Sequence, residues 1–217
     1  MADRKVSRRR KISVAWVLGA ALLIPGVLAP APPARAQWCA DVDVVVARGT
    51  GETGYLGGEV GDPLYGVLRD RLPASTSAYR VEYPADLADP RSVGAGSADL
   101  VAHLANQAAR CRGQRFVVVG YSQGAAVVHT ALGTGPTLAV PGGVRLGDDL
   151  GGRIVAVLLF GDPMRLIGWN PPDAYLWRTG NYCTAGDPVC AGGLNPAAHV
   201  AYGADFAAAA NFAADRL

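Results

Sequence analysis

The serine at position 122 lies in a pattern that can make a nucleophile. It is the centre of Gly-Tyr-Ser-Gln-Gly at residues 120–124, a G-x-S-x-G motif. The motif follows the apolar run 116–119 and precedes an alanine- and valine-rich run at 123–132, which predicts a strand, a sharp turn and a helix. Such a turn holds the serine hydroxyl at the edge of a sheet, above a helix N-terminus that favours negative charge. The alternative is a glycine-rich strand–helix turn without chemistry.

A serine nucleophile needs a general base, and the chain has 3 histidines. His103 falls within a predicted helix at 92–110, and His129 lies two turns along the helix after Ser122, where it points away from the turn. His199 lies in a loop rich in Gly, Pro and Ala, just before the last predicted helix. Because a loop can carry a base across to the serine, we predict His199 as the base. We expect the other two to be packing or helix-surface residues.

Two aspartates compete for the role of the acid that orients the base. Asp162 directly follows an apolar run, and Asp187 lies inside a short segment bounded by two cysteines. Both precede His199, so the chain order Ser–Asp–His does not separate them. A small cross-linked loop would hold a carboxylate in one place, as the orientation of an imidazole requires, whereas Asp162-Pro163 is typical of a turn after a strand. We therefore predict Asp187.

Acyl transfer at a serine also needs hydrogen-bond donors for an oxyanion. The backbone N–H of Gln123, directly after the serine, supplies one donor in this type of turn. The second is expected in the loop after the first predicted strand, where Arg-Gly-Thr-Gly occupies residues 48–51. Thr50 offers both its N–H and its hydroxyl there. We predict an oxyanion hole formed by Thr50 and Gln123.

The first 36 residues have the form of a secretory signal peptide. Residues 1–11 are basic, residues 12–29 are uncharged and mostly apolar, and Ala34 and Ala36 stand at positions −3 and −1 of a cleavage site. Three consecutive arginines at 8–10 make twin-arginine export an alternative to the general route. An uncleaved membrane anchor is a second alternative, although an apolar stretch of this length with a proline is marginal for spanning. We expect a secreted or cell-envelope protein with a mature domain at 37–217.

Composition and charge describe the mature domain only after this segment is removed. The 217 residues carry 20 Lys+Arg against 18 Asp+Glu, a net charge of +2, which argues against a strong nucleic-acid binder. Residues 37–217 keep 13 Arg, no Lys and 17 acids, so the folded domain is acidic. A hydrophobic share of 50% suits one domain with a sizeable core, and 28 Gly with 15 Pro predict many tight turns.

All four cysteines fall within the predicted mature domain. An even number of cysteines in an oxidising compartment indicates two disulfides, with three ways to pair them. Cys183 and Cys190 flank a turn-rich run that can bring its ends together, so we pair these two and join Cys39 to Cys111. A zinc site is the alternative, but no second close Cys/His pair supports it. We expect no metal and no organic cofactor.

Apolar strands alternate with helical stretches along this domain. Such alternation is typical of a parallel sheet covered by helices on both faces, with its chemistry in loops at the carboxyl ends of the strands. One expected helix begins near Pro63 and has an apolar face that extends to Leu72. The other expected helices span 92–110, 123–132 and 205–217, and a Gly/Pro loop is expected at 134–152. The expected strands are 42–47, 79–83, 116–119, 154–160 and 175–178.

These motifs together resemble the cutinase family of secreted serine esterases, and the exported, Ala/Gly-rich character is most similar to cutinase-like proteins of mycobacteria and related actinobacteria. The matching segments span nearly the whole mature chain in the family's order. They are Arg-Gly-Thr-Gly-Glu (48–52), Val-Glu-Tyr-Pro-Ala (81–85), Gly-Tyr-Ser-Gln-Gly (120–124), Phe-Gly-Asp-Pro (160–163), Cys-Thr-Ala-Gly-Asp-Pro-Val-Cys (183–190) and His-Val-Ala-Tyr (199–202).

The resemblance implies a compact α/β-hydrolase with a five-stranded parallel sheet and no large lid. It implies the same triad, Ser122, Asp187 and His199, and the same oxyanion donors; many family members have serine where this chain has Thr50. It also agrees with the disulfide pairing. The implied activity is hydrolysis of short- to medium-chain acyl esters through an acyl-enzyme.

Two other functions compete with this one. A small polar acyl group, as in acetylxylan esterases, is the enzymatic alternative. A cell-surface binding or antigenic protein with a vestigial site is the alternative outside catalysis. We expect the acyl group to lie against Leu87, Val189 and Leu194, each of which has a plain packing role as its alternative. We also expect a monomer that contacts its lipid or polymer substrate transiently.

Overall fold

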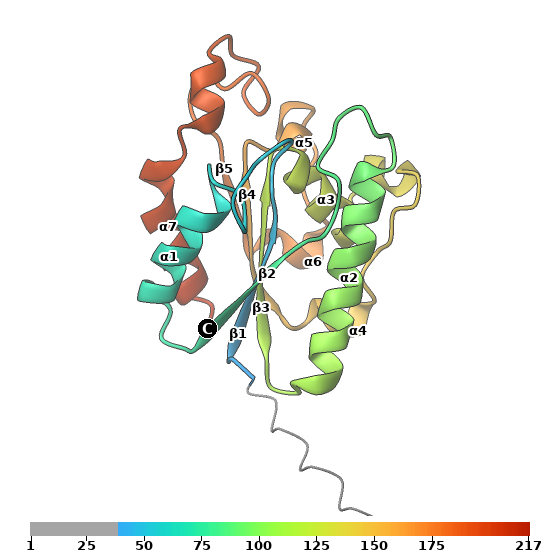
Figure 1. Cartoon of the computed structure of the whole chain (residues 1–217), viewed down its shortest axis with the longest axis vertical. Coiled ribbons are helices and arrows are strands. Elements are labelled where there is room, and N and C mark those ends of the chain that lie inside the picture. Colours follow the sequence, from blue (N-terminus) through green and yellow to red (C-terminus); the bar gives the residue numbers. More distant parts are fainter. Residues whose placement is uncertain (1–38) are drawn as a thin grey trace, which may run out of the picture. The chain divides into compact units, whose positions relative to one another are not determined.

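The computed structural model describes residues 39–217, and the predicted signal peptide lies outside them. Their centre is a five-stranded sheet in the order β2-β1-β3-β4-β5, with every neighbouring pair parallel (Figure 1). This confirms the expected architecture. The strands are β1 (Val42–Ala47), β2 (Thr76–Arg80), β3 (Arg115–Tyr121), β4 (Ile154–Phe160) and β5 (Thr179–Tyr182).

The three central strands are apolar because both of their faces are buried. Along β1, Val44 and Val46 pack on one side of the sheet, and Val45 and Ala47 pack on the other. Side chains alternate between faces of a strand, so a run without polar residues fills two cores at once. Asp43 is the polar exception in β1, and its carboxylate is paired with His103, 2.7 Å away.

Two layers of helices cover the sheet (Figure 1). The longer helices α1 and α7 pack on one face, and α2 and α3 pack on the other. Within the described residues, no helix is long and apolar enough to cross a membrane. The helices are α1 (Gly61–Arg71), α2 (Ser92–Arg110), α3 (Gln123–Leu132), α4 (Asp148–Gly151), α5 (Pro163–Leu166), α6 (Asp173–Leu176), α7 (Phe206–Ala214), and the 3-10 turns η1 (Gly135–Ala139), η2 (Pro196–Val200) and η3 (Gly203–Asp205).

The sequence misplaced the two edge strands. The expected strand at 175–178 is wrong, because α6 occupies its first half, a turn follows, and β5 begins only at Thr179. Pro172 and Asp173 start a helical turn well, and Tyr175 fills the core from that turn. At the opposite edge, β2 ends at Arg80 rather than continuing to residue 83. Both edge strands lack the apolar run that marks a strand buried on both faces.

Other boundaries shift less. The segment 134–152 holds η1 and α4 rather than loop alone, and the closing helix begins with the separate turn η3. Helices α2 and α3 have the expected limits.

The strand register brings distant loops to one edge of the sheet. Ala47 pairs with Gly120, and Phe160 pairs with both Tyr121 and Tyr182. These residues lie at the carboxyl ends of four strands, so the loops that follow them start side by side. The segments that carry the predicted nucleophile, acid and oxyanion donors therefore share the carboxyl edge, where parallel α/β sheets place their sites.

Candidate active site

Ser122 occupies a strained turn between β3 and α3. Its φ is 54° and its ψ is −117°, a left-handed conformation that costs free energy in a non-glycine residue. The N–H of Ser122 donates to Phe160 O at 2.9 Å, which ties the turn to the end of β4. The neighbouring glycines are required for space: a Cβ on Gly124 would lie 1.9 Å from Ala47 O, and one on Gly120 would lie 2.7 Å from Ala125 Cα. The motif thus folds as the sequence predicts.

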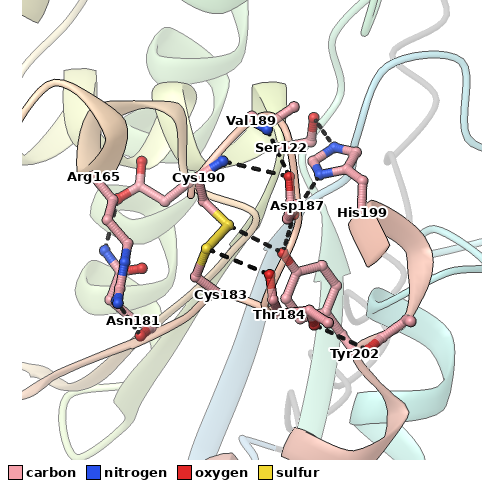
Figure 2. The surroundings of a disulfide bond; sticks show 12 residues. Ser122, Arg165, Asn181, Cys183, Thr184, Asp187, Val189, Cys190, His199 and Tyr202 are labelled. Atoms are coloured by element: carbon pink, nitrogen blue, oxygen red, sulfur yellow. Dashed lines mark hydrogen bonds and ion pairs between the residues drawn. A yellow bond between two sulfur atoms is a disulfide. The ribbon is translucent and has the colours of Figure 1, made fainter. Parts of the chain in front are cut away.

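The Ser122 hydroxyl, His199 and Asp187 form one chain of hydrogen bonds (Figure 2). Ser122 Oγ lies 2.9 Å from His199 Nε2, and His199 Nδ1 lies 2.8 Å from Asp187 Oδ2. Ser122 comes from the turn after β3, Asp187 from the loop after β5, and His199 from η2. The structure therefore brings together three residues separated by as many as 77 positions in the sequence.

Asp187 is fixed by the cross-linked loop that contains it. The structure joins Cys183 to Cys190 and Cys39 to Cys111, the two pairings that the cysteine spacing predicts. Asp187 Oδ1 accepts the N–H of Val189 at 2.6 Å, and Oδ2 faces His199 and the hydroxyl of Tyr202 (Figure 2). Burial raises the pKa of Asp187, but the hydrogen bonds from Tyr202, His199 and Val189 outweigh it and leave that pKa below its usual value. This carboxylate is thus held ionised against the imidazole.

Asp162 belongs to a different buried pair. Its Oδ2 lies 3.0 Å from His129 Nε2, and both side chains are fully buried. Asn181 donates to the same oxygen at 2.7 Å, and His129 Nδ1 contacts the hydroxyl of Thr134 at 2.7 Å. This network joins α3 to the ends of β4 and β5 and is separate from the Ser122 hydrogen-bond chain. His103, the third histidine, stacks on Tyr79 with ring centroids 3.5 Å apart.

The loop after β1 presents donors beside the serine. The N–H groups of Thr50 and Gln123 have no acceptor among the described residues, and the Thr50 hydroxyl lies 3.4 Å from Gln123 Oε1. Glu52 holds this loop in place, because its carboxylate accepts the N–H groups of Gly49 and Glu59. Burial raises the pKa of Glu52. Gln123 Nε2 also donates to Asp86 O at 3.1 Å, which links the turn to a second loop at the same edge.

The serine and histidine open into a cavity of about 510 Å³. Leu87 and Val189 line it as expected, but Leu194 does not, because it lies on a loop tip with 98% of its side chain exposed. The cavity also has a polar wall that includes Thr53 and Glu59, which no sequence motif marks as functional. The full lining is Thr50, Gly51, Glu52, Thr53, Gly58, Glu59, Leu87, Tyr121, Ser122, Val189, His199 and Val200.

No metal-binding arrangement accompanies this cavity. Across residues 39–217, no group of three His, Cys, Asp or Glu side chains is placed to hold a metal ion. The arrangement can instead move a proton between Ser122 Oγ and the imidazole while a carboxylate balances the charge. A fold of this kind with such a site defines a serine hydrolase of the α/β class.

Comparison with known proteins gives the family. A model of the Cutinase family matches residues 38–217, so the chain belongs to the cutinase family and is a serine esterase. It is 41% identical over 163 residues to a cutinase of Kineococcus radiotolerans, a match that covers 71% of this chain and 53%, about half, of that protein. It is 36% identical to a cutinase of Botryotinia fuckeliana (93% of this chain, 96% of that one) and 36% identical to phospholipase Culp4 of Mycobacterium tuberculosis (88% and 83%).

Solved structures agree with this assignment. The catalytic core of a Trichoderma reesei acetyl xylan esterase superposes with a TM-score of 0.69 and 26% identity, over 83% of this chain and 100% of that one. A Trichoderma reesei cutinase in complex with a phosphonate inhibitor superposes with a TM-score of 0.66 and 30% identity, over 82% and 76%.

Proposed function

We propose that the chain hydrolyses short- to medium-chain acyl esters, with Ser122 as nucleophile, His199 as general base and Asp187 as the acid that orients the base. The observation that carries this proposal is the unbroken chain of hydrogen bonds from Ser122 Oγ through both ring nitrogens of His199 to Asp187 Oδ2. Its serine end opens into the cavity, beside two N–H groups that are available to a ligand.

The proposed reaction passes through an acyl-enzyme. His199 takes the proton of Ser122 as Oγ attacks the ester carbonyl carbon, and the N–H groups of Thr50 and Gln123 donate to the resulting oxyanion. His199 then gives the proton to the leaving alcohol, and the acyl group stays on Oγ. A water molecule, deprotonated by His199, attacks the acyl carbon and releases the acid together with the free serine.

The apolar part of the cavity supports an acyl chain as the substrate group. Leu87, Val189 and Val200 lie on this part, and Leu87 is 77% exposed at the mouth, where it can contact a chain that extends outward. Acetylated polysaccharide is the second candidate. The polar wall with Thr53 and Glu59 favours it, as does the likeness to an acetyl xylan esterase.

A series of p-nitrophenyl esters from acetate to palmitate tests the acyl group. We expect kcat/KM to rise from acetate to a maximum at about four to eight carbons, because each CH2 that leaves water adds about 0.8 kcal/mol until the apolar lining is used up. Ser122→Ala protein supplies the background rate. A maximum at acetate with little activity on longer chains would instead support the acetyl-ester candidate. No turnover, together with no labelling by an organophosphonate, would support a binding protein with a vestigial site.

We also propose that the protein is exported and that the signal peptide is removed after Ala36. Two disulfides in the folded domain support an oxidising compartment. The expected mature N-terminus is Gln37, and N-terminal sequencing of protein from the culture medium or cell envelope tests it. An intact residue 1 in the exported protein would point to the uncleaved anchor instead.

A further inference from the structure

Tyr202 contacts Asp187 of the proposed triad. It lies three residues after His199, and its side chain is fully buried. Its hydroxyl donates to Asp187 Oδ2, the same oxygen that faces His199 Nδ1 at 2.8 Å (Figure 2). The hydroxyl also lies 3.4 Å from Cys190 Sγ, which has no hydrogen to donate in a disulfide. The phenol and the imidazole therefore share one carboxylate oxygen.

We propose that Tyr202 is a positioning residue for ester hydrolysis: its hydroxyl competes with His199 for Asp187 Oδ2 and thereby limits how tightly the carboxylate holds the protonated base. This inference rests on the proposed function of Ser122, Asp187 and His199. It adds a fourth side chain, one that touches neither substrate nor the reacting atoms.

The two oxygens of the Asp187 carboxylate have different kinds of donor. Backbone N–H groups donate to Oδ1, and side chains donate to Oδ2. Oδ1 accepts N–H groups from Val189 at 2.6 Å and Cys190 at 3.4 Å, so the backbone fixes the plane of the carboxylate. Among residues 39–217, Oδ2 receives only the two side-chain donors, His199 and Tyr202. Loss of the phenol hydroxyl would thus leave the carboxylate in place but give all of Oδ2 to the imidazole.

The hydroxyl of Tyr202 remains a donor throughout the working range. Burial, the hydrogen bond to Asp187 and the charge of Asp187 together raise the pKa of Tyr202 well above its usual value, so the phenol stays protonated. Its ring packs edge-on against Phe160 and Tyr121, with centroids 5.6 Å and 6.0 Å away. Phenylalanine would keep these ring contacts and remove the hydroxyl, and with it the hydrogen bond to Asp187 and the contacts with Cys190 Sγ and the Thr184 backbone.

The other titratable groups around the imidazole stay the same in such a variant. Tyr121 also contacts the imidazole, with ring centroids 5.2 Å apart, and its hydroxyl donates to His199 O at 2.8 Å. Burial raises the pKa of Tyr121, so it stays neutral. Glu52 and Glu59 line the same cavity as His199. A change in pH dependence after loss of the phenol hydroxyl therefore reports on the Tyr202–Asp187 bond.

The test is the pH profile of kcat/KM for Tyr202→Phe, with each rate divided by the concentration of sites titrated by an organophosphonate. Without the competing donor, Asp187 holds the imidazolium more tightly, so the inactive protonated form persists to higher pH. We expect the acidic limb to move up by about one pH unit, with KM within about twofold of wild type. Tyr182→Phe is the matched control, because its half-buried ring stacks on Phe160 and its hydroxyl bonds to none of residues 39–217.

A second change moves the profile in the opposite direction. Replacement of Tyr202 by 3-fluorotyrosine strengthens the phenol donor and keeps the shape of the ring, so we expect the acidic limb to move to lower pH. The 3-fluorotyrosine protein also tests the proposal if the Tyr202→Phe protein does not fold. Acidic limbs within about 0.2 pH units of wild type in the folded variants would overturn the proposal, whatever the change in kcat. A fully active Ser122→Ala protein would instead overturn the proposed function itself.

Discussion

Replacement of Ser122 by alanine is expected to lower kcat/KM for a p-nitrophenyl ester by about 10⁴- to 10⁶-fold, because no other hydroxyl within residues 39–217 contacts His199 Nε2. Ser122 Oγ is the atom that lies 2.9 Å from this nitrogen. The turn should keep its shape, since the positive φ of Ser122 is imposed by the strand before it and the helix after it. The remaining rate should be that of the oxyanion donors and binding alone.

A buried serine elsewhere in the fold provides the control. Ser97 lies on α2, and its hydroxyl donates to Gly94 O and accepts from Val144 N. Ser97→Ala removes two hydrogen bonds from the core but none from the cavity, so its activity per folded molecule should match wild type. Retention of more than about 1% of wild-type activity by purified Ser122→Ala protein would show that another group is the nucleophile.

Replacement of Asp187 by asparagine is expected to lower kcat by about 10³- to 10⁴-fold with little change in KM. The amide removes the negative charge that stabilises the imidazolium. Its NH2 group also cannot accept from His199 Nδ1, so the ring is free to adopt the wrong tautomer. The loop should remain closed, because the Cys183–Cys190 bond and its backbone hydrogen bonds do not depend on the charge.

Asp162→Asn is the matched control for this prediction, since Asp162 is also a fully buried aspartate that pairs with a histidine. Its loss should lower the melting temperature, because His129 and Asn181 lose the acceptor that they share. It should leave kcat within about tenfold of wild type at a temperature where the protein is folded. If Asp162→Asn instead had a much lower kcat than Asp187→Asn, the orienting acid would be Asp162.

The sequence predicted the site well where chemistry restricts the choice of residue. A strand–serine–helix turn needs glycines beside the serine, and Gly124 indeed packs against the carbonyl of Ala47. Of the three histidines, His199 alone lies outside the long helices, in the short 3-10 turn η2 (Pro196–Val200). The short spacing of Cys183 and Cys190 indicated a closed loop, and that loop holds Asp187 against His199.

The sequence predicted less where a residue's surroundings come from distant segments. Tyr202 was visible as the end of His-Val-Ala-Tyr, but its contact with Asp187 depends on the path of the disulfide loop. Leu194 is apolar and near His199 in the chain, yet the loop turns it into solvent. The edge strand β5 reads Thr-Gly-Asn-Tyr, and the apolar period that identified the central strands is absent from it.

Both ends of the described domain lie at the amino edge of the sheet. The disulfide of Cys39 joins it to Cys111, just before β3, and the Leu217 carbonyl accepts a hydrogen bond from Arg115 at the start of β3. The cavity is at the other end, across strands of 7 residues, or about 20 Å. A fusion partner, purification tag or solid support attached at residue 39 or residue 217 therefore leaves the cavity open, and the enzyme is suited to immobilisation by either end.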